Sequence, residues 1–190
     1  MNPRPGKPRA RGLTSIRGPY YSPVGRSYLT DLLDALGHAV DSIKYAGGSF
    51  AVMDRETVRG LNAVAHDHDV LVSTGGFLER VVTWGDVHVE PCLRECRDLG
   101  FDIIEVSSGF ISLGDDRFLE LLGRVQAAGF RAIAEVGIQR GAGGASTVDA
   151  LEQAGTVDPE VALVRAERAR DAGAELILIE SEGITEQVRE

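Results

Sequence analysis

Lysine and positive charge are scarce in this chain of 190 residues. Of its 20 basic residues only Lys7 and Lys44 are lysines, which leaves 18 arginines. The 29 acidic residues outnumber the basic ones and give a net charge of -9, which opposes binding to nucleic acid phosphates. A chain that uses arginine for nearly every cation, yet places Lys44 after the apolar Ile43, indicates that an amine is needed at that position.

Cysteine and long apolar runs are also scarce. There are two cysteines, and the aliphatic run Leu176–Ile179 is far shorter than the roughly 20 apolar residues of a membrane span. The first ten residues mix basic residues with prolines and lack the apolar stretch of a signal peptide. We therefore expect a cytoplasmic protein without membrane or nucleic acid partners, in which residues 1–10 are a disordered arm and residues 11–190 a single domain.

Short apolar runs alternate with amphipathic segments along the rest of the chain, the pattern typical of βα units in a parallel sheet. Three helix-to-strand junctions contain a glycine suited to cap a helix, namely Gly100, Gly129 and Gly173. The expected strands are Leu13–Arg17, Ser42–Tyr45, Val70–Ser73, Asp102–Val106, Arg131–Val136 and Glu175–Glu180, and the expected helices are Ser27–Leu36, Arg55–His66, Val89–Leu99, Asp116–Ala128 and Pro159–Ala172.

Such units build either a (β/α)₈ barrel or an open, doubly wound sheet. Polar residues at successive strand ends favour the barrel, whose active site lies at that rim. The open sheet usually has a glycine-rich first turn, and residues 12–18 carry no dinucleotide fingerprint. The predicted fold is therefore α/β of the TIM-barrel type, truncated after about six βα units because a complete barrel takes about 250 residues. Open sheet edges would favour a homo-oligomer.

Carboxylates end three of the expected strands. Glu105, Glu135 and Glu180 would lie on neighbouring strands, where they could converge on one Mg²⁺ ion, which prefers oxygen ligands. Glu182 could replace any one of them. The alternative is that these carboxylates form structural ion pairs with arginines.

Cationic and glycine-rich segments end the other strands. Lys44 could bind an anion or donate a proton, and Arg17 could clamp an anion with two hydrogen bonds. The backbone N–H groups of Ser73-Thr74-Gly75-Gly76 could cradle an anionic group at the start of a helix. The alternatives are a structural role for each cation and a simple tight turn at Gly75-Gly76.

Six motifs in this order resemble the phosphosulfolactate synthase family: Gly12-Leu13-Thr14, Ile43-Lys44 followed by Gly-Gly-Ser, Gly75-Gly76, Ile104-Glu105-Val106-Ser107, Ala134-Glu135-Val136-Gly137 and Ile179-Glu180-Ser181-Glu182-Gly183. The resemblance covers residues 11–190. The segments Arg17–Tyr21 and Glu135–Gln139 look like a bacterial branch of the family, which is similar to a plant heat-stress-associated protein.

The resemblance implies a TIM-barrel carbon–sulfur lyase that adds sulfite to phosphoenolpyruvate with Mg²⁺. The product would be (2R)-phospho-3-sulfolactate, as in coenzyme M biosynthesis. The implied catalytic residues are Lys44, Glu105 and Glu135, the substrate-binding residues Thr14, Arg17, Ser73, Gly75, Gly76 and Ser107, and the metal ligands Glu105, Glu135, Glu180 and Glu182.

One departure from the family pattern keeps an alternative open. Archaeal members carry a lysine soon after Glu-Val-Gly, where this chain has Ile138, Gln139 and Arg140, so the role of that lysine cannot be transferred. The alternative function is a non-catalytic, stress-related or small-molecule-binding barrel of the same family.

Overall fold

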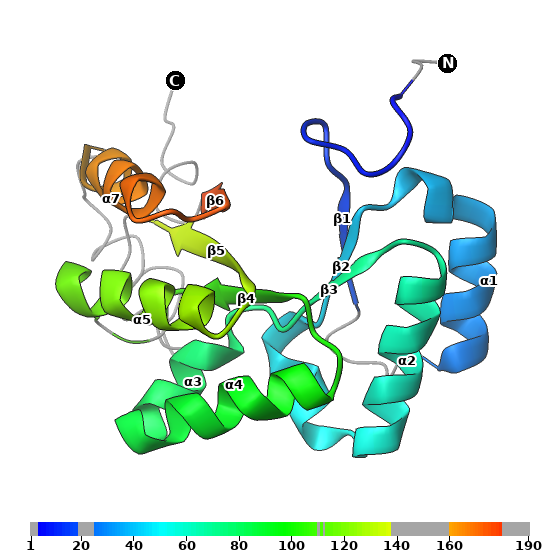
Figure 1. Ribbon diagram of the computed structural model, residues 1–190, viewed down its shortest axis with the longest axis horizontal. Helices are drawn as coiled ribbons and strands as arrows, with labels where there is room; N and C mark the ends of the chain where they lie inside the picture. Colours follow the sequence, from blue (N-terminus) through cyan, green and yellow to red (C-terminus); the bar gives the residue numbers. More distant parts are fainter. Residues whose placement is uncertain (1–3, 19–24, 110, 112, 138–159, 180–190) are drawn as a thin grey trace, which may run out of the picture. The chain divides into compact units, whose positions relative to one another are not determined.

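The computed structural model describes residues 4–18, 25–109, 111, 113–137 and 160–179 (Figure 1). The chain divides into two compact units. Unit 1 contains residues 1–77 and 90–103, and unit 2 contains residues 78–89 and 104–190. Strand β4 (Ile103–Val106) contributes its first residue to unit 1 and the others to unit 2.

Unit 1 contains three short parallel strands that pair in chain order, β1 (Ser15–Arg17), β2 (Ser42–Lys44) and β3 (Leu71–Ser73). Ser73 of β3 then pairs with Ile103. Helices α1 (Arg26–Leu36) and α2 (Arg55–Asp67) pack against each other, and α4 (Val89–Asp98) lies in this unit apart from its first residue. Two 3₁₀ helices, η1 (Gly37–Ala39) and η2 (Ala46–Val52), flank β2.

Unit 2 is built on β4, β5 (Arg131–Val136) and β6 (Leu176–Ile179), with β5 and β6 parallel. Helix α5 (Asp115–Ala127) packs on β5, and α7 (Glu160–Asp171) packs on β5 and β6 (Figure 1). Helix α3 (Phe77–Trp84) and the 3₁₀ helix η3 (Asp86–His88) precede α4. Across the described ranges, no helix is long and apolar enough to cross a membrane.

The six strands follow one another across the sheet in chain order, from β1 to β6. A doubly wound sheet would reverse its strand order at a switch point, whereas a TIM barrel adds each strand beside the previous one. The predicted α/β fold of the barrel type is therefore confirmed, and the open-sheet alternative is wrong. Five of the six expected strands match to within two residues at each end, and the sixth, expected to end at Glu180, reaches the limit of the described residues at Ile179.

The glycine caps predicted at the helix-to-strand junctions are confirmed. Gly100, Gly129 and Gly173 have φ angles of 84°, 85° and 88°, in the region that glycine adopts most easily. A fourth junction of this kind follows α2, where Asp69 has a φ of 55° and donates its N–H to the His66 carbonyl at 2.9 Å. The sequence motif did not reveal this copy because aspartate replaces the glycine.

Basic side chains of the N-terminal segment have defined partners in unit 1. Lys7 donates to the carbonyls of His68 (2.8 Å) and Asp69 (3.0 Å), and Arg9 pairs with Asp41 at 2.8 Å. Arg4 donates to the Ala39 carbonyl at 3.0 Å. An arm was predicted over residues 1–10. Residues 1–3 lie outside the described residues, and Arg4, Lys7 and Arg9 contact the segments that precede β2 and β3.

Candidate functional site

Three predicted site residues lie side by side at the ends of β1, β2 and β3. Arg17 pairs in register with Lys44, and Lys44 with Ser73, so their side chains lie on the same face of the sheet. Arg17 is exposed, Lys44 is half-buried and Ser73 is buried. In unit 1 the structure therefore brings two cations and a hydroxyl group together at the carboxyl ends of the strands, where TIM barrels carry their active sites.

Gly75 adjoins the stem of Lys44. Its φ is 61°, and a Cβ atom at this position would lie 2.7 Å from the Tyr45 carbonyl oxygen and 3.3 Å from Lys44 Cε. The Gly75 N–H donates to Ser73 Oγ at 3.1 Å, and the Thr74 hydroxyl donates to the Gly75 carbonyl. This turn therefore uses the Gly75 N–H to orient Ser73, and the half-buried Gly76 follows it just before α3.

Thr14 lies at the opposite end of β1 from Arg17. Its carbonyl accepts hydrogen bonds from the N–H groups of Asp41 (2.8 Å) and Ser42 (3.2 Å), and its own N–H donates to Asp41 Oδ2 at 2.8 Å. Asp41 directly precedes β2. The structure therefore does not bring Thr14 to the strand ends that carry Lys44 and Ser73.

An aromatic cluster that sequence reasoning missed fixes the segment after β2. The ring of Phe50 contacts those of Tyr45, Phe77 and Phe101, at centroid distances of 5.9, 4.9 and 4.8 Å. The Tyr45 hydroxyl donates to Asn62 Oδ1 at 2.9 Å, and burial raises the pKa of Tyr45. The aromatic residues are widely spaced in the sequence, so no local pattern signals that they meet.

Two predicted carboxylates lie in unit 2, on neighbouring strands. Glu105 of β4 is only 2% exposed, and its buried Oε2 atom makes no hydrogen bond within the described part of the chain. Glu135 of β5 is half-buried between the buried Ala134 and Val136, so strand alternation places it on the face opposite to theirs. Glu180 and Glu182 lie outside the described residues.

The donor chemistry of this pair fits Mg²⁺. This ion takes hard oxygen ligands and is commonly bound by one or two carboxylates, with water and substrate completing its shell. Within the residues that the structure describes, no three or more Asp, Glu, His or Cys side chains group as a metal site. Glu105 and Glu135 are the predicted metal ligands that lie among the described residues.

Glu79 of α3 reaches the loop that follows β4. This carboxylate is only 3% exposed, and it accepts hydrogen bonds from Ser107 Oγ and from the Ile111 N–H, both at 2.7 Å. Ser107 is itself buried, two residues beyond Glu105. The predicted substrate-binding residue Ser107 is thus fixed by a carboxylate that sequence reasoning did not identify.

Arg165 of α7 holds the other part of the same loop. Its guanidinium donates to Ser108 Oγ (2.7 Å), to the Leu113 carbonyl (2.9 Å) and to Asp115 Oδ1 (3.0 Å). It also lies over the ring of Phe118, 4.9 Å from the centroid. Because Arg165 is only 2% exposed, these contacts replace its hydration.

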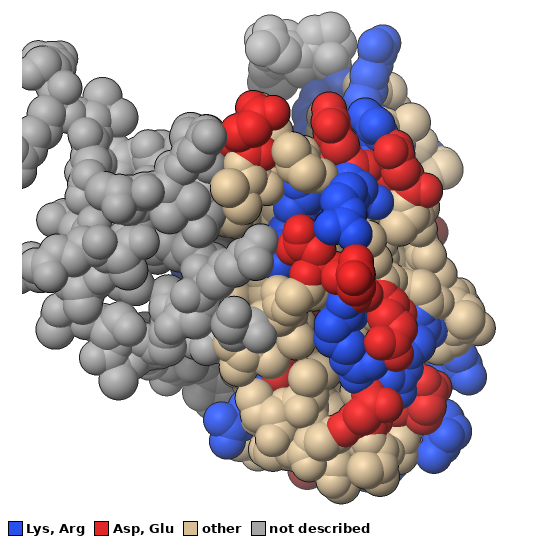
Figure 2. Space-filling view, turned by 90° about the vertical axis from the view of Figure 1, so that its left-hand side faces the viewer, with Lys and Arg blue, Asp and Glu red and all other residues tan. Residues whose placement is uncertain are grey.

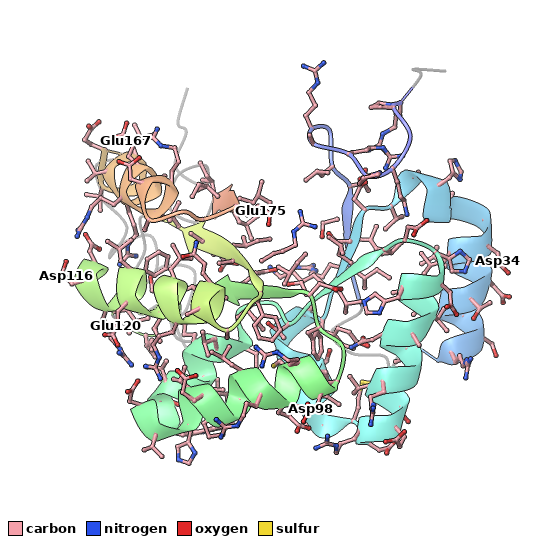
Figure 3. All side chains as sticks on the ribbon, in the orientation of Figure 1. Asp34, Asp98, Asp116, Glu120, Glu167 and Glu175 are labelled. Atoms are coloured by element: carbon pink, nitrogen blue, oxygen red, sulfur yellow. The ribbon has the colours of Figure 1, made fainter. Side chains whose placement is uncertain are left out.

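Neither Glu79 nor Arg165 carries a sequence signal, because charged residues within amphipathic helices normally face solvent. The helical residues labelled in Figure 3, namely Asp34, Asp98, Asp116, Glu120 and Glu167, are exposed in this way. On the face shown in Figure 2, acidic and basic side chains are interleaved, and exposed pairs such as Arg168–Asp116 occur in unit 2. Burial is what separates Glu79, Glu105 and Arg165 from these surface charges; they are the charged residues buried in the described part of the chain.

Comparisons with known proteins agree on one family. The model of (2R)-phospho-3-sulfolactate synthase (ComA) matches residues 2–190. A phosphosulfolactate synthase from Methanothermobacter thermautotrophicus is 30% identical over 94% of this chain, and one from Methanocaldococcus jannaschii is 26% identical over 90%. The Arabidopsis thaliana protein HEAT-STRESS-ASSOCIATED 32 is 28% identical over 95%. The chain spans 64%, 62% and 67% of the lengths of these three relatives, respectively.

Similar solved structures support the fold. The carboxyl transferase domain of Rhizobium etli pyruvate carboxylase, with pyruvate, aligns with a TM-score of 0.52 and 13% identity, over 86% of this chain and 26% of that one. A D-psicose 3-epimerase in the presence of D-fructose aligns with a TM-score of 0.50 and 12% identity, over 93% of this chain and 66% of that one. At these identities the similarity concerns the fold alone, and it agrees with the barrel-type order of the strands.

Proposed function

Because the chain belongs to the (2R)-phospho-3-sulfolactate synthase (ComA) family, we propose that it adds sulfite to phosphoenolpyruvate. The sulfur atom attacks the methylene carbon and forms the C–S bond. The electron pair of the C=C bond moves to the carbon that bears the phosphate and carboxylate, and that carbon then takes up a proton. The phosphate ester stays intact, so the product is (2R)-phospho-3-sulfolactate.

The row formed by Arg17, Lys44 and Ser73 carries this proposal. Both substrates are anions, and the row offers two cations and a hydroxyl group in register at the strand ends. The Arg17 guanidinium can bind a carboxylate or phosphate through two hydrogen bonds. The Lys44 ammonium neutralises charge that develops on the substrate or supplies the proton to carbon.

Unit 2 supplies the candidate metal ligands of the proposal. Glu105 and Glu135 would hold Mg²⁺, which when bound supplies positive charge to the electron-rich substrate. The chain's own contribution is to keep hard oxygen ligands in place: Glu105 is buried on β4, and the packing around it restricts its side chain. Ser107 lies two residues farther along, in the loop after β4.

The two lysines of the chain provide a matched test. We expect that incubation with phosphoenolpyruvate, sulfite and Mg²⁺ gives a new phosphate ester signal in ³¹P NMR, and that chelation by EDTA stops its formation. Lys44→Ala should slow the reaction at least about a hundredfold, because it removes charge stabilisation or the proton donor. Lys7→Ala removes the other lysine, which donates to carbonyls beyond α2, and should leave the rate unchanged. Equal rates in the two variants would contradict the role proposed for Lys44.

A second candidate function is a non-catalytic, stress-related or small-molecule-binding barrel of the same family. The match to HEAT-STRESS-ASSOCIATED 32, at 28% identity over 95% of the chain, favours it. Calorimetry distinguishes the two functions: binding of phosphoenolpyruvate that requires Mg²⁺, without any new ³¹P signal after sulfite is added, would support the second function. Formation of the sulfonated product would reject it.

A further inference from the structure

We propose that Glu79 is a positioning residue, which sets the polarity of the Ser107 hydroxyl and holds the loop after β4. The β4–α5 loop comprises residues 107–114, between the end of β4 and the start of α5. The inference deepens the proposed function and rests on it only for the link to the reaction. Its physical basis lies entirely within unit 2.

The hydrogen bonds of Glu79 determine which way the Ser107 proton points. A carboxylate can only accept hydrogen bonds, so the Ser107 hydroxyl must donate its proton to Glu79 Oε2. The Ser107 oxygen can then act toward any further partner only as an acceptor. That polarity suits a cation or a water bound to a cation, and it does not suit a phosphate or carboxylate group of a substrate.

The position of Ser107 places this acceptor next to a candidate cation ligand. Glu105 belongs to the end of β4, and Ser107 follows the strand directly, two residues farther along the chain. Both are buried. In this proposal Ser107 supports a cation, whereas the sequence predicted that it binds the substrate.

Glu79 also holds the loop at a second point, because its Oε1 atom accepts from the Ile111 N–H. Arg165 holds the loop at Ser108 and Leu113. Two buried side chains from different helices therefore fix the loop at Ser107, Ser108, Ile111 and Leu113.

Glu79→Gln is the most informative variant. Glutamine keeps the size of the side chain, and its carbonyl oxygen can still accept from the Ile111 N–H. Its NH₂ group then faces Ser107 and donates to the hydroxyl oxygen, which reverses the polarity of that contact. Ser107→Ala removes the hydroxyl and keeps the bond to Ile111. Glu120→Gln is the control, because Glu120 is an exposed carboxylate of α5.

Two measurements that do not depend on turnover test the proposal. Amide hydrogen exchange at Ile111 should accelerate at least about tenfold in Glu79→Ala, which removes a hydrogen bond to a charged group, and less than about threefold in Glu79→Gln and Ser107→Ala. Mn²⁺, used as the probe ion in electron paramagnetic resonance titrations, should bind about tenfold more weakly to Glu79→Gln and Ser107→Ala. Glu120→Gln should match the wild type in both measurements.

The outcomes separate this proposal from the proposed function. Unchanged Ile111 exchange in Glu79→Ala, or unchanged Mn²⁺ affinity in folded Glu79→Gln, would overturn the positioning role, as would a wild-type protein that binds no Mn²⁺. A wild-type protein that binds Mn²⁺ with the expected sensitivity, yet forms no sulfonated product, would keep the positioning role and reject the proposed function.

Discussion

The starts and the ends of the strands carry polar groups of different kinds. At the starts, Asp41 before β2 accepts from the Thr14 N–H and pairs with Arg9, and Asp102 before β4 accepts from the Val72 N–H at 2.8 Å and contacts His66 at 2.9 Å. Each of these aspartates contacts both a backbone N–H in or next to the neighbouring strand and a basic side chain. We therefore infer that they stabilise the fold.

At the ends of β3 and β4, by contrast, several polar groups are buried and follow no such pattern. Ser73 and Thr74 at the end of β3, and Glu105, Ser107 and Ser108 of β4 and its loop, are all buried. Burying polar groups costs free energy unless their hydrogen bonds are replaced, so a chain rarely places so many there without a function. The difference indicates that substitutions at strand starts should affect stability, and those at strand ends should affect function.

The largest effect is expected for Glu105→Gln. Glutamine keeps the size of the buried side chain but removes the charge that would bind Mg²⁺, so the rate of product formation should fall at least about a hundredfold. Thermal unfolding followed by circular dichroism should show a folded protein. The exposed variant Glu120→Gln should retain the wild-type rate. A Glu105→Gln protein within threefold of the wild type would remove Glu105 from the site.

Gly75→Ala should combine the two kinds of effect, because this strand-end residue also has a constrained backbone. The added Cβ would meet the Tyr45 carbonyl at 2.7 Å, and the φ of 61° is unfavourable for alanine. We expect a loss of about 2–4 kcal/mol in the free energy of unfolding. Gly60→Ala is the control: it lies within α2 with nothing within 4 Å of the added Cβ, and it should stabilise by about 0.5–1 kcal/mol. Destabilisation by both variants would contradict this explanation.

Asp41→Ala tests the strand starts. It removes charge-assisted hydrogen bonds to Arg9 and to the Thr14 N–H, and should lower the free energy of unfolding by about 2–3 kcal/mol. For a chain of this length the melting temperature would fall by about 4–12 °C. Product formation per folded molecule should not change at temperatures below the transition. A loss of activity without a loss of stability would break the distinction between strand starts and strand ends.

The smallest effect is expected at the helix-to-strand junction after α2. Asp69 has the φ that Gly100, Gly129 and Gly173 adopt at the other three junctions. Asp69→Gly should therefore stabilise the protein by about 0.5–1 kcal/mol, measured by urea denaturation. The reverse change, Gly129→Asp, should destabilise. Stabilisation by both would show that side-chain contacts, rather than φ, control these junctions.

The sequence predicts the framework of the fold well and the interior of the site poorly. Runs rich in valine and isoleucine, such as Ile103–Val106, mark buried strands, and glycines mark the caps, because both signals are local. A helix was expected after Gly76, but no bounds were predicted for α3, because it has only eight residues and is rich in β-branched and aromatic types, which favour helices weakly. Tertiary packing stabilises this helix.

The site residues also divide into those that the sequence could predict and those that it could not. Lys44 and Ser73 could be predicted because each ends an apolar run, and the parallel register then places them together. Glu79 and Arg165 could not, since each is one of several charges on a helix and only the packed structure shows which of them is buried. Thr14 was predicted to bind the substrate because it belongs to one of the ordered motifs. Its hydrogen bonds to Asp41 instead hold it at the start of β1, away from the strand ends.

The central claim is that the strand ends of this chain carry out the addition of sulfite to phosphoenolpyruvate. The most direct test is ³¹P NMR of the wild type, Glu105→Gln and Asp41→Ala at equal concentrations of folded protein, with Mg²⁺ and both substrates present. We predict the new phosphate ester signal in the wild type and in Asp41→Ala, and its loss in Glu105→Gln. No new signal in the wild type, or an equal signal in all three proteins, would contradict the claim.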